Sequence, residues 1–240
     1  MSGASPDRRR LRVATYNIHS GVGTDGRCDP ARIAAVINEL SADVVALQEV
    51  ESRHGDLDTL AFLAQRTGMR AVPGPTMLRD EGDYGNALLT RAGLLEVRHV
   101  DLSFPGREPR GAIDAVLQFG QATLRVLATH LGLRPAERRQ QIETLLGGLD
   151  EPRLPTVLMG DLNEWFLWGR PLRRLHAHFG ETPAPATFPA GRPLFALDRL
   201  WVKPLRCLAR LAAHRSPLAR VASDHLPLAA TLELETDHAL

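Results

Sequence analysis

Short apolar runs that each end on a polar residue are the feature that most restricts how this chain can fold. Residues 44–47 are all apolar and lead into Glu49, and the largely apolar residues 156–159 lead into Asp161. Runs of this length predict buried strands. In layered α/β folds the ends of such strands converge on one edge, where ligand sites form. The pattern therefore predicts an α/β fold with polar side chains gathered at one edge of its sheets.

The predicted strands outnumber the predicted helices, and the helices fall in both halves of the chain. Strands are expected over residues 11–16, 44–47, 86–90, 94–100, 112–119, 123–129, 156–159, 197–202 and 226–234. Helices are expected over residues 30–40, after an Asp29 cap, over 57–65 and over 135–149, and residues 181–193 are expected to form a long loop. This order favours two stacked sheets with helices outside them.

The length of 240 residues, 44% of them hydrophobic, suits one domain with a substantial core. The sequence contains no internal repeat and no change of composition that would mark a second domain. We expect a flexible tail over residues 1–10, one domain over residues 11–235 and a short tail over residues 236–240.

Neither the cysteines nor the hydropathy of the chain points to secretion or to a membrane span. Cys28 and Cys207 form no CxxC pair, so they predict neither a disulfide framework nor a structural zinc site. The N-terminus lacks the apolar stretch of a secretory signal, and no apolar run reaches the length of a span. We expect a soluble, cytoplasmic protein.

The charge of the chain is balanced overall but uneven along the sequence. A net charge of +1, from 29 basic and 28 acidic residues, excludes nucleic-acid binding by bulk charge alone. Residues 165–223 nevertheless contain ten basic side chains against Glu181 and Asp198. Two interpretations stay open: a solvated face balanced by acids elsewhere, or a surface for an anionic substrate or an anionic membrane.

The polar residues at the strand ends form a chemically coherent set of three carboxylates, two amides and two imidazoles. They are Asn17, Glu49, His130, Asp161, Asn163, Asp224 and His225. Each taken alone has an ordinary structural explanation, such as a turn former, a helix cap or a surface ion pair. Their shared position at strand ends instead favours a site for Mg2+ or Mn2+, which prefer such oxygen ligands.

Six segments of the chain together resemble the endonuclease/exonuclease/phosphatase superfamily, in the order that the family has them. They are Thr15-Tyr-Asn-Ile18, Leu47-Gln-Glu49, Gly85-Asn-Ala-Leu-Leu-Thr-Arg91, Thr129-His-Leu131, Gly160-Asp-Leu-Asn163 and Ser223-Asp-His225. The resemblance implies a four-layer α/β/β/α sandwich with two mixed, largely antiparallel sheets. It also implies a metal-dependent phosphodiesterase, a hydrolase of ester bonds that uses Mg2+ or Mn2+.

The resemblance assigns Glu49 as the principal Mg2+ ligand and Asp224 as a further carboxylate of the metal site. It places Asn17 beside both the metal and the phosphate. Arg110 resembles the substrate-facing arginine of the family, and Asn86 belongs to the segment that contacts the substrate. These assignments are carried over from the family's motifs and not from spacing.

The resemblance assigns the proton chemistry to a second group of residues. Asp161 and Asn163 resemble the pair that orients the attacking water and holds a phosphate oxygen. His225 resembles the general base or transition-state stabiliser, and Asp198 resembles the aspartate that orients it; whether Asp161 or His225 takes the proton stays open. His130, which abasic-site endonucleases replace with tyrosine, is expected to protonate the leaving oxygen, so an abasic-site activity is disfavoured.

The substrate is less constrained by the sequence than the reaction. The favoured function is a phosphodiesterase acting on a phospholipid or another small phosphodiester, with peripheral contact to the anionic inner membrane. A DNA or RNA endonuclease or exonuclease is the alternative, disfavoured because the chain has no obvious DNA-clamping insertion, and a non-catalytic binding protein on this scaffold is a third. No obligate protein partner is evident.

Two further segments have more than one interpretation. Trp165 and Trp168 are expected in the core or on a helix packing face, with a lip for an acyl chain or a base as the alternative. Residues 205–218 are expected to be a buried strand, with an interfacial hairpin or helix as the alternative. Arg199 stands where the family often has histidine or tyrosine, and no role follows for it.

Overall fold

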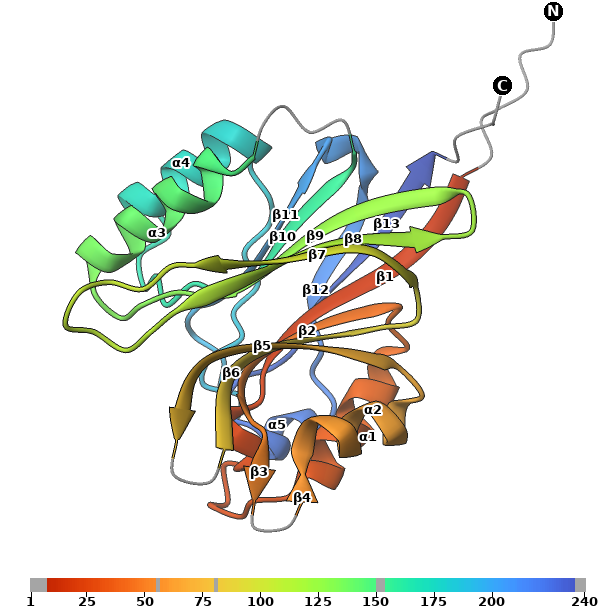
Figure 1. Cartoon of the computed structure of the whole chain (residues 1–240), viewed down its shortest axis with the longest axis vertical. Coiled ribbons are helices and arrows are strands. Elements are labelled where there is room, and N and C mark those ends of the chain that lie inside the picture. Colours follow the sequence, from red (N-terminus) through yellow and green to blue (C-terminus); the bar gives the residue numbers. More distant parts are fainter. Residues whose placement is uncertain (1–7, 55–56, 80–81, 150–153, 236–240) are drawn as a thin grey trace, which may run out of the picture.

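Two β-sheets stacked face to face form the centre of the computed structural model, which describes residues 8–54, 57–79, 82–149 and 154–235 (Figure 1). The larger sheet has six strands in the order β12-β13-β1-β2-β6-β5. Its strands are β12 (Leu208–Ala213), β13 (Leu228–Glu235), β1 (Arg8–Asn17), β2 (Val44–Glu51), β6 (Gly82–Thr90) and β5 (Arg70–Arg79).

The second sheet has five strands in the order β11-β10-β9-β8-β7. They are β11 (Asp198–Lys203), β10 (Thr156–Asp161), β9 (Ala122–His130), β8 (Gly111–Phe119) and β7 (Gly93–Asp101). In each large sheet one neighbouring pair is parallel, β1 with β2 and β9 with β10, while the other pairs are antiparallel. A small hairpin of β3 (Arg53–His54) and β4 (Leu57–Asp58) lies outside both.

Helices cover the outer face of each sheet, which gives four layers (Figure 1). α1 (Pro30–Leu40), α2 (Thr59–Thr67) and α5 (Ala219–Ala222) lie against the six-stranded sheet, and α3 (Pro135–Gly147) and α4 (Arg170–Phe179) lie against the five-stranded sheet. Two short 3-10 turns, η1 (His19–Gly21) and η2 (Leu205–Cys207), complete the elements. The predicted α/β/β/α sandwich with two mixed, largely antiparallel sheets is confirmed.

Alternating side chains explain why the sheets stack in this way. In β1, Val13 faces the core between the two sheets, whereas Ala14 and Tyr16 face the core under α1. Successive residues of a strand point to opposite faces of the sheet. A strand with apolar residues on both faces therefore needs a packed layer on each side of it. The same holds for β11, where Leu200 faces the other sheet and Trp201 packs under α3 and α4.

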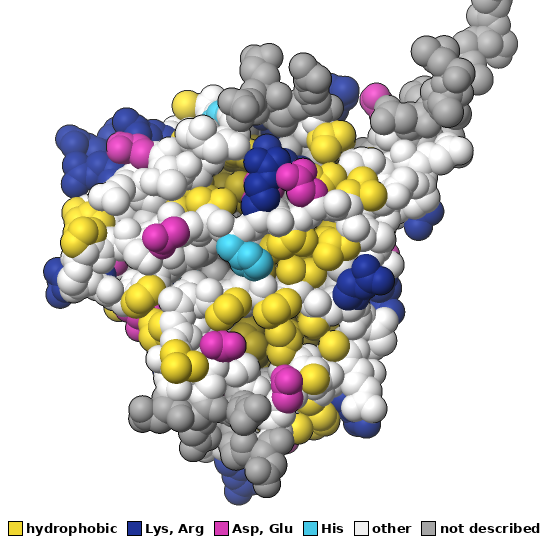
Figure 2. Space-filling view, in the orientation of Figure 1, with side chains coloured by type: hydrophobic (Ala, Val, Ile, Leu, Met, Phe, Trp, Pro, Cys, Tyr) yellow, Lys and Arg dark blue, Asp and Glu magenta, His cyan; other side chains and the backbone are white. Residues whose placement is uncertain are grey.

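Exposed hydrophobic side chains mark the face of the molecule in Figure 2. Hydrophobic side chains gather over the middle of this face, where the edge strands β5 and β7 lie in Figure 1. Both strands expose large apolar residues, Leu78 on β5 and Leu95 on β7.

The structure departs from the sequence-based expectations at several elements. β1 begins at Arg8, inside the predicted tail, while residues 1–7 and 236–240 lie outside the described residues; the domain limits stay a prediction. β5 was not predicted from the sequence. It contains Pro73 and Pro75, which disfavour a central strand. The structure places β5 at the edge of its sheet beside β6, where proline is tolerated.

Two more corrections concern the second half of the chain. The short amphipathic helix α4 was missed, although Leu172, Leu175 and Phe179 bury one of its faces. The predicted buried strand within residues 205–218 is wrong in its burial, because β12 is a half-exposed edge strand that follows η2. None of the helices in the described part of the chain is long and apolar enough to cross a membrane.

Gly160 is required by a close contact inside the five-stranded sheet. Its φ of +155° is unfavourable for other residues, and a Cβ at this position would overlap the carbonyl oxygen of Thr129 on β9. The absence of a side chain therefore lets β10 lie flat beside β9 at the point where Asp161 follows.

We predict that Gly160→Ala lowers the free energy of unfolding by about 2 kcal/mol or more, because it adds overpacking to an unfavourable backbone angle. Gly147→Ala is the matched control, since no atom lies within 4 Å of its added Cβ at the end of α3. Its stability should stay unchanged or rise by up to about 1 kcal/mol. Urea denaturation of both variants measures the difference, and equal stabilities would contradict the role of Gly160.

Candidate active site

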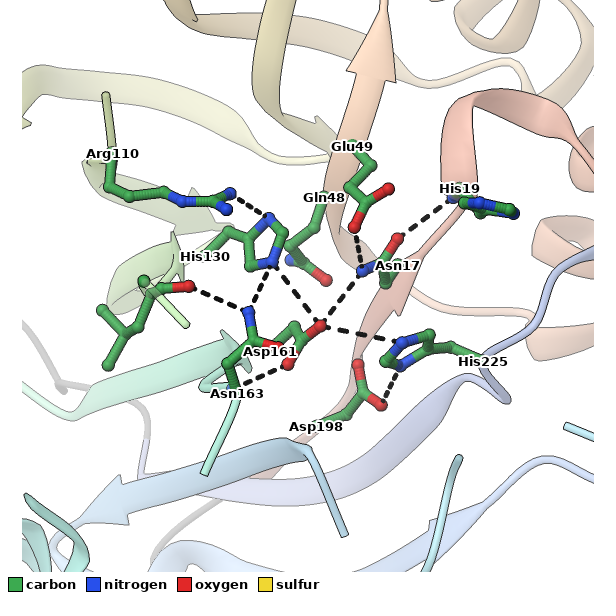
Figure 3. Close-up of polar contacts among 12 residues, drawn as sticks. Asn17, His19, Gln48, Glu49, Arg110, His130, Asp161, Asn163, Asp198 and His225 are labelled. Atoms are coloured by element: carbon green, nitrogen blue, oxygen red, sulfur yellow. Dashed lines mark hydrogen bonds and ion pairs between the residues drawn. The ribbon is translucent and has the colours of Figure 1, made fainter. Parts of the chain in front are cut away.

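Asn17 joins two carboxylates that belong to different sheets. Its Nδ2 donates to Glu49 Oε1 at 2.9 Å and to Asp161 Oδ2 at 3.0 Å (Figure 3). Asn17 ends β1, Glu49 lies on the neighbouring β2, and Asp161 ends β10 of the other sheet. The convergence of strand ends that the sequence predicts is therefore present, and it occurs between the sheets as well as along one edge.

An irregular stretch of β2 presents Glu49 to this site. The pairing of β2 with β6 shifts register between Leu47 and Val50, and Glu49 has a positive φ of 55°. Burial raises the pKa of the Glu49 carboxyl, and the negative charge of Asp161 adds to this against the hydrogen bond from Asn17. The strained position is typical of functional residues, because the surrounding structure must hold it in place.

Asp161 is the centre of the cluster in Figure 3. Its Oδ2 lies 3.6 Å from His130 Nε2 and 3.8 Å from His225 Nε2, and its Oδ1 accepts a hydrogen bond from the backbone N–H of Asn163. Strand register brings these residues together, because Asp161 pairs with His130 on one side and with Asp198 on the other.

Asn163 and Arg110 fix the ring of His130. Asn163 Nδ2 lies 3.0 Å from His130 Nε2 and donates to the Leu131 carbonyl at 2.9 Å, with Asn163 in a left-handed conformation. Arg110 Nη1 lies 2.9 Å from His130 Nδ1, and its Nη2 pairs with Glu108 at 3.0 Å. Both neighbours of the ring are donors, and a neutral imidazole has only one acceptor nitrogen, so His130 can accept from Arg110 or from Asn163 but not from both at once.

His130 is consequently neutral in this arrangement. Burial, with the positive charge of Arg110 beside it, lowers the pKa of His130 to about 3. A neutral imidazole has no extra proton to release near pH 7 in this arrangement, and the role of His130 as the acid that protonates the leaving oxygen stays a prediction.

His225 has the opposite protonation state. Its Nδ1 lies 2.8 Å from Asp198 Oδ2, which also accepts a hydrogen bond from Thr187. Burial favours the neutral ring, but the charges of Asp198 and Asp161 outweigh it and raise the pKa of His225 to about 10. The predicted orientation of the histidine by Asp198 is present in the geometry, and the ring is held as an imidazolium between two carboxylates.

Two predicted residues lie at the border of the cluster. Asp224 is partly exposed, and its Oδ1 lies 3.8 Å from His19 Nδ1. Asn86 donates to the Gly111 carbonyl at 2.9 Å, so it supports the chain next to Arg110. Its predicted contact with the substrate stays a prediction.

Two groups of donors could hold a divalent cation. Ligand atoms of Asp161, Asp198 and His225 lie within 4.8 Å of one another. In this arrangement, however, protons of His225 already occupy the space between the two aspartates, so a cation there would have to displace them. Glu49 and Asp161 instead share one amide donor, Asn17, and burial, with the negative charge of Asp161 beside it, raises the pKa of the Glu49 carboxyl.

This donor set fits a hard cation, which takes carboxylate oxygens and neutralises closely spaced negative charges. Asn17 itself is arranged differently from the expected ligand. Its Oδ1 accepts a hydrogen bond from the backbone N–H of His19 while its Nδ2 faces the carboxylates, so it positions ligands in this arrangement.

Sequence reasoning missed several residues that the fold brings to the site. Thr187 and Phe188 come from the long loop of residues 181–193, which carried no site prediction; the Phe188 ring centre lies 4.8 Å from that of His225. His19 follows the Asn17 motif by two residues and contacts Asp224. Only proximity to a quoted motif could have indicated His19, and nothing in the sequence distinguishes Thr187.

Tryptophans Trp165 and Trp168, expected in the core or on a helix packing face, are exposed on the loop between β10 and α4. Arg199 is buried on the outer face of β11, where burial lowers its pKa to about 10 and its Nε donates to the Ala196 carbonyl. Its side chain therefore supports the loop before β11.

Residues 14–225 match the model of the endonuclease/exonuclease/phosphatase family. The uncharacterized protein YbhP of Escherichia coli (strain K12) is 31% identical over 248 residues, which cover 93% of this chain and 96% of YbhP. The endonuclease/exonuclease/phosphatase protein of Beutenbergia cavernae is 26% identical with a TM-score of 0.77, covering 95% of this chain and 72% of that one.

The human Nocturnin catalytic domain has the same fold, with a TM-score of 0.70 at 19% identity over 97% of this chain and all of that one. The match to the family model covers every residue of the carboxylate and histidine cluster described above. The chain therefore belongs to the endonuclease/exonuclease/phosphatase family, whose members are hydrolases of phosphodiester and phosphate ester bonds.

Proposed function

We propose that this chain is a Mg2+-dependent phosphodiesterase that cleaves its substrate by in-line attack of a water molecule. The observation that carries the proposal is the arrangement of charged groups around Asp161. The Glu49 carboxylate, held by Asn17, lies on one side. The His225 imidazolium, held by Asp198, lies on the other. Such a site offers a cation position, a proton acceptor and a fixed positive charge within one cluster.

Glu49 and Asp161 are the residues that would hold the metal, with Asp224 available from the border of the site. Mg2+ bound there would neutralise charge on the phosphate oxygens and lower the pKa of a coordinated water. Asn17 keeps the two carboxylates in place through its amide nitrogen.

The protein groups divide the remaining tasks. Asp161 is the carboxylate in position to accept the proton of the attacking water. His225, held as an imidazolium, stabilises the negative charge that develops on the phosphoryl oxygens. Arg110 and Asn163 orient a further oxygen through donated hydrogen bonds.

Removing the charge of Glu49 or the ring of His225 should abolish hydrolysis without unfolding the protein. We predict that Glu49→Gln and His225→Ala each lower kcat/KM for bis(p-nitrophenyl) phosphate with Mg2+ by at least about 100-fold. EDTA should remove the activity of the wild-type protein, and added Mg2+ should restore it.

Glu96→Gln is the control, because Glu96 forms an ion pair with the exposed Arg98 on β7 and is not part of the active site. It should keep the wild-type rate. Circular dichroism and thermal unfolding establish that the variants fold. A near wild-type rate in either active-site variant would refute the assignment.

The protonation of His225 can be measured directly. We predict that the imidazole of His225 stays protonated through neutral pH in the metal-free protein, because its pKa is raised to about 10. Asp198→Asn removes one of the two nearby charges, so the pKa of His225 should fall by at least about one unit.

Proton–nitrogen NMR of the imidazole from pH 5 to pH 10 follows this titration, with His225→Gln to assign the signal. Rotation of the ring is separated from the charge effect by the tautomer pattern of the same spectra. A wild-type His225 that titrates near its ordinary pKa of about 6.5 would contradict the prediction.

A further inference from the structure

A band of large apolar side chains is exposed on the loops that border the candidate active site. We call it the apolar rim. Its members are Leu133, Trp165, Phe166, Leu167, Trp168 and Leu194. Trp168 is 72% exposed, and four consecutive members come from the loop between β10 and α4. Scattered apolar residues need no explanation, but a contiguous exposed patch marks an interaction surface.

Side-chain contacts join the three loops that carry the rim. Trp165 packs edge-on against Phe195 with ring centres 4.9 Å apart, which links the β10–α4 loop to the loop before β11. Arg138 connects the third loop, because it pairs with Glu164 at 3.2 Å and donates to the Leu133 carbonyl at 2.7 Å. The rim is therefore one surface assembled from separate segments.

The rim has a rigid base. Glu164 and Arg138 are both almost completely buried, and the Glu164 carboxylate also accepts a hydrogen bond from the Phe166 backbone N–H. A Cβ on Gly169 would come within 2.6 Å of the Glu164 carboxyl carbon, so the loop closes tightly around this side chain. A buried ion pair of this kind fixes geometry more than it adds stability. Here the ion pair anchors the loop that carries the exposed apolar side chains of the rim.

The rim continues to the catalytic histidine. Trp165 packs edge-on against Phe188 with ring centres 5.8 Å apart, and Phe188 lies 4.8 Å from the ring of His225. A partner that contacts the rim is thus adjacent to the groups proposed to cleave a phosphodiester.

Positive charge flanks the rim. Arg134 follows Leu133 directly, and Arg170 and Arg192 each lie two residues along the chain from a rim member. All three are exposed, and none pairs with a carboxylate in the described part of the chain. Aromatic and aliphatic side chains beside unpaired arginines match the chemistry of an anionic membrane surface.

We propose that the apolar rim seats this protein on a bilayer that contains anionic phospholipid. This inference rests on the proposed function. Binding of the rim to the bilayer, which we call the seating, brings the phosphodiester of a lipid headgroup to Asp161 and His225. A single-stranded nucleic acid fits less well, because base stacking needs open aromatic faces. Half of the rim is aliphatic, and the Trp165 ring is already in contact with the rings of Phe188 and Phe195.

Vesicle sedimentation tests the seating on the full chain. The wild-type protein should sediment with phosphatidylcholine vesicles that contain 25% phosphatidylglycerol, and binding should weaken with added salt or without phosphatidylglycerol. Leu167→Glu and Trp168→Ala should each lower the partition coefficient at least tenfold. Leu95→Glu is the matched control, because Leu95 and Leu167 are the same residue type and both are 57% exposed.

The experiment separates the seating from the proposed reaction. All three variants should hydrolyse bis(p-nitrophenyl) phosphate at the wild-type rate, because none changes a residue of the active site. Loss of vesicle binding in Leu167→Glu with retained hydrolysis supports the proposal. Vesicle binding without hydrolysis in the wild type would refute the proposed function and keep the seating.

Three outcomes would overturn the seating. They are no binding of the wild-type protein to the anionic vesicles, equal losses in Leu167→Glu and Leu95→Glu, and rim-dependent binding to single-stranded oligothymidylate in place of vesicles. The last result would assign the rim to a nucleic acid.

Discussion

The amide of Asn17 is the contact on which the arrangement of the site depends. The two sheets meet mainly through apolar faces, and such packing is not directional. Asn17 Nδ2 donates at once to a carboxylate of its own sheet and to Asp161 of the opposite sheet. Its position at the end of β1 therefore sets how the strand ends of one sheet face those of the other.

Around Asp161 the same side-chain type has two protonation states. His130 faces a guanidinium and is neutral, whereas His225 faces carboxylates and is protonated. When the environments of two similar groups shift their pKa values in opposite directions, the two groups can take different roles in catalysis. The division depends on second partners, Arg110 and Asp198, neither of which lies next to its histidine in the sequence.

Apolar runs, caps and polar residues at strand ends predicted two stacked sheets with helices outside them and a cluster of polar side chains at the strand ends. The family resemblance, and not local pattern, supplied Arg110, Asp198 and the roles of the residues. Sequence-based prediction failed where tertiary context decides. Pro73 and Pro75 are acceptable in β5 only because the strand lies at an edge. Trp168 is exposed, although a tryptophan is hydrophobic enough to be expected in the core. The neutral state of His130 depends on its contact with Arg110, and the spacing of the two residues in the sequence does not reveal that contact.

The place of β1 within the larger sheet makes its pairing depend on a strand from far along the chain. β1, the first described strand, lies between β2 and β13, the last, and pairs with β13 from Arg8 to Thr15. One edge of β1 is therefore unpaired in any chain that stops before β13. His225 lies just before that strand. A chain that stops before residue 225 thus lacks both the strand that covers this edge of β1 and the imidazole that contacts Asp198.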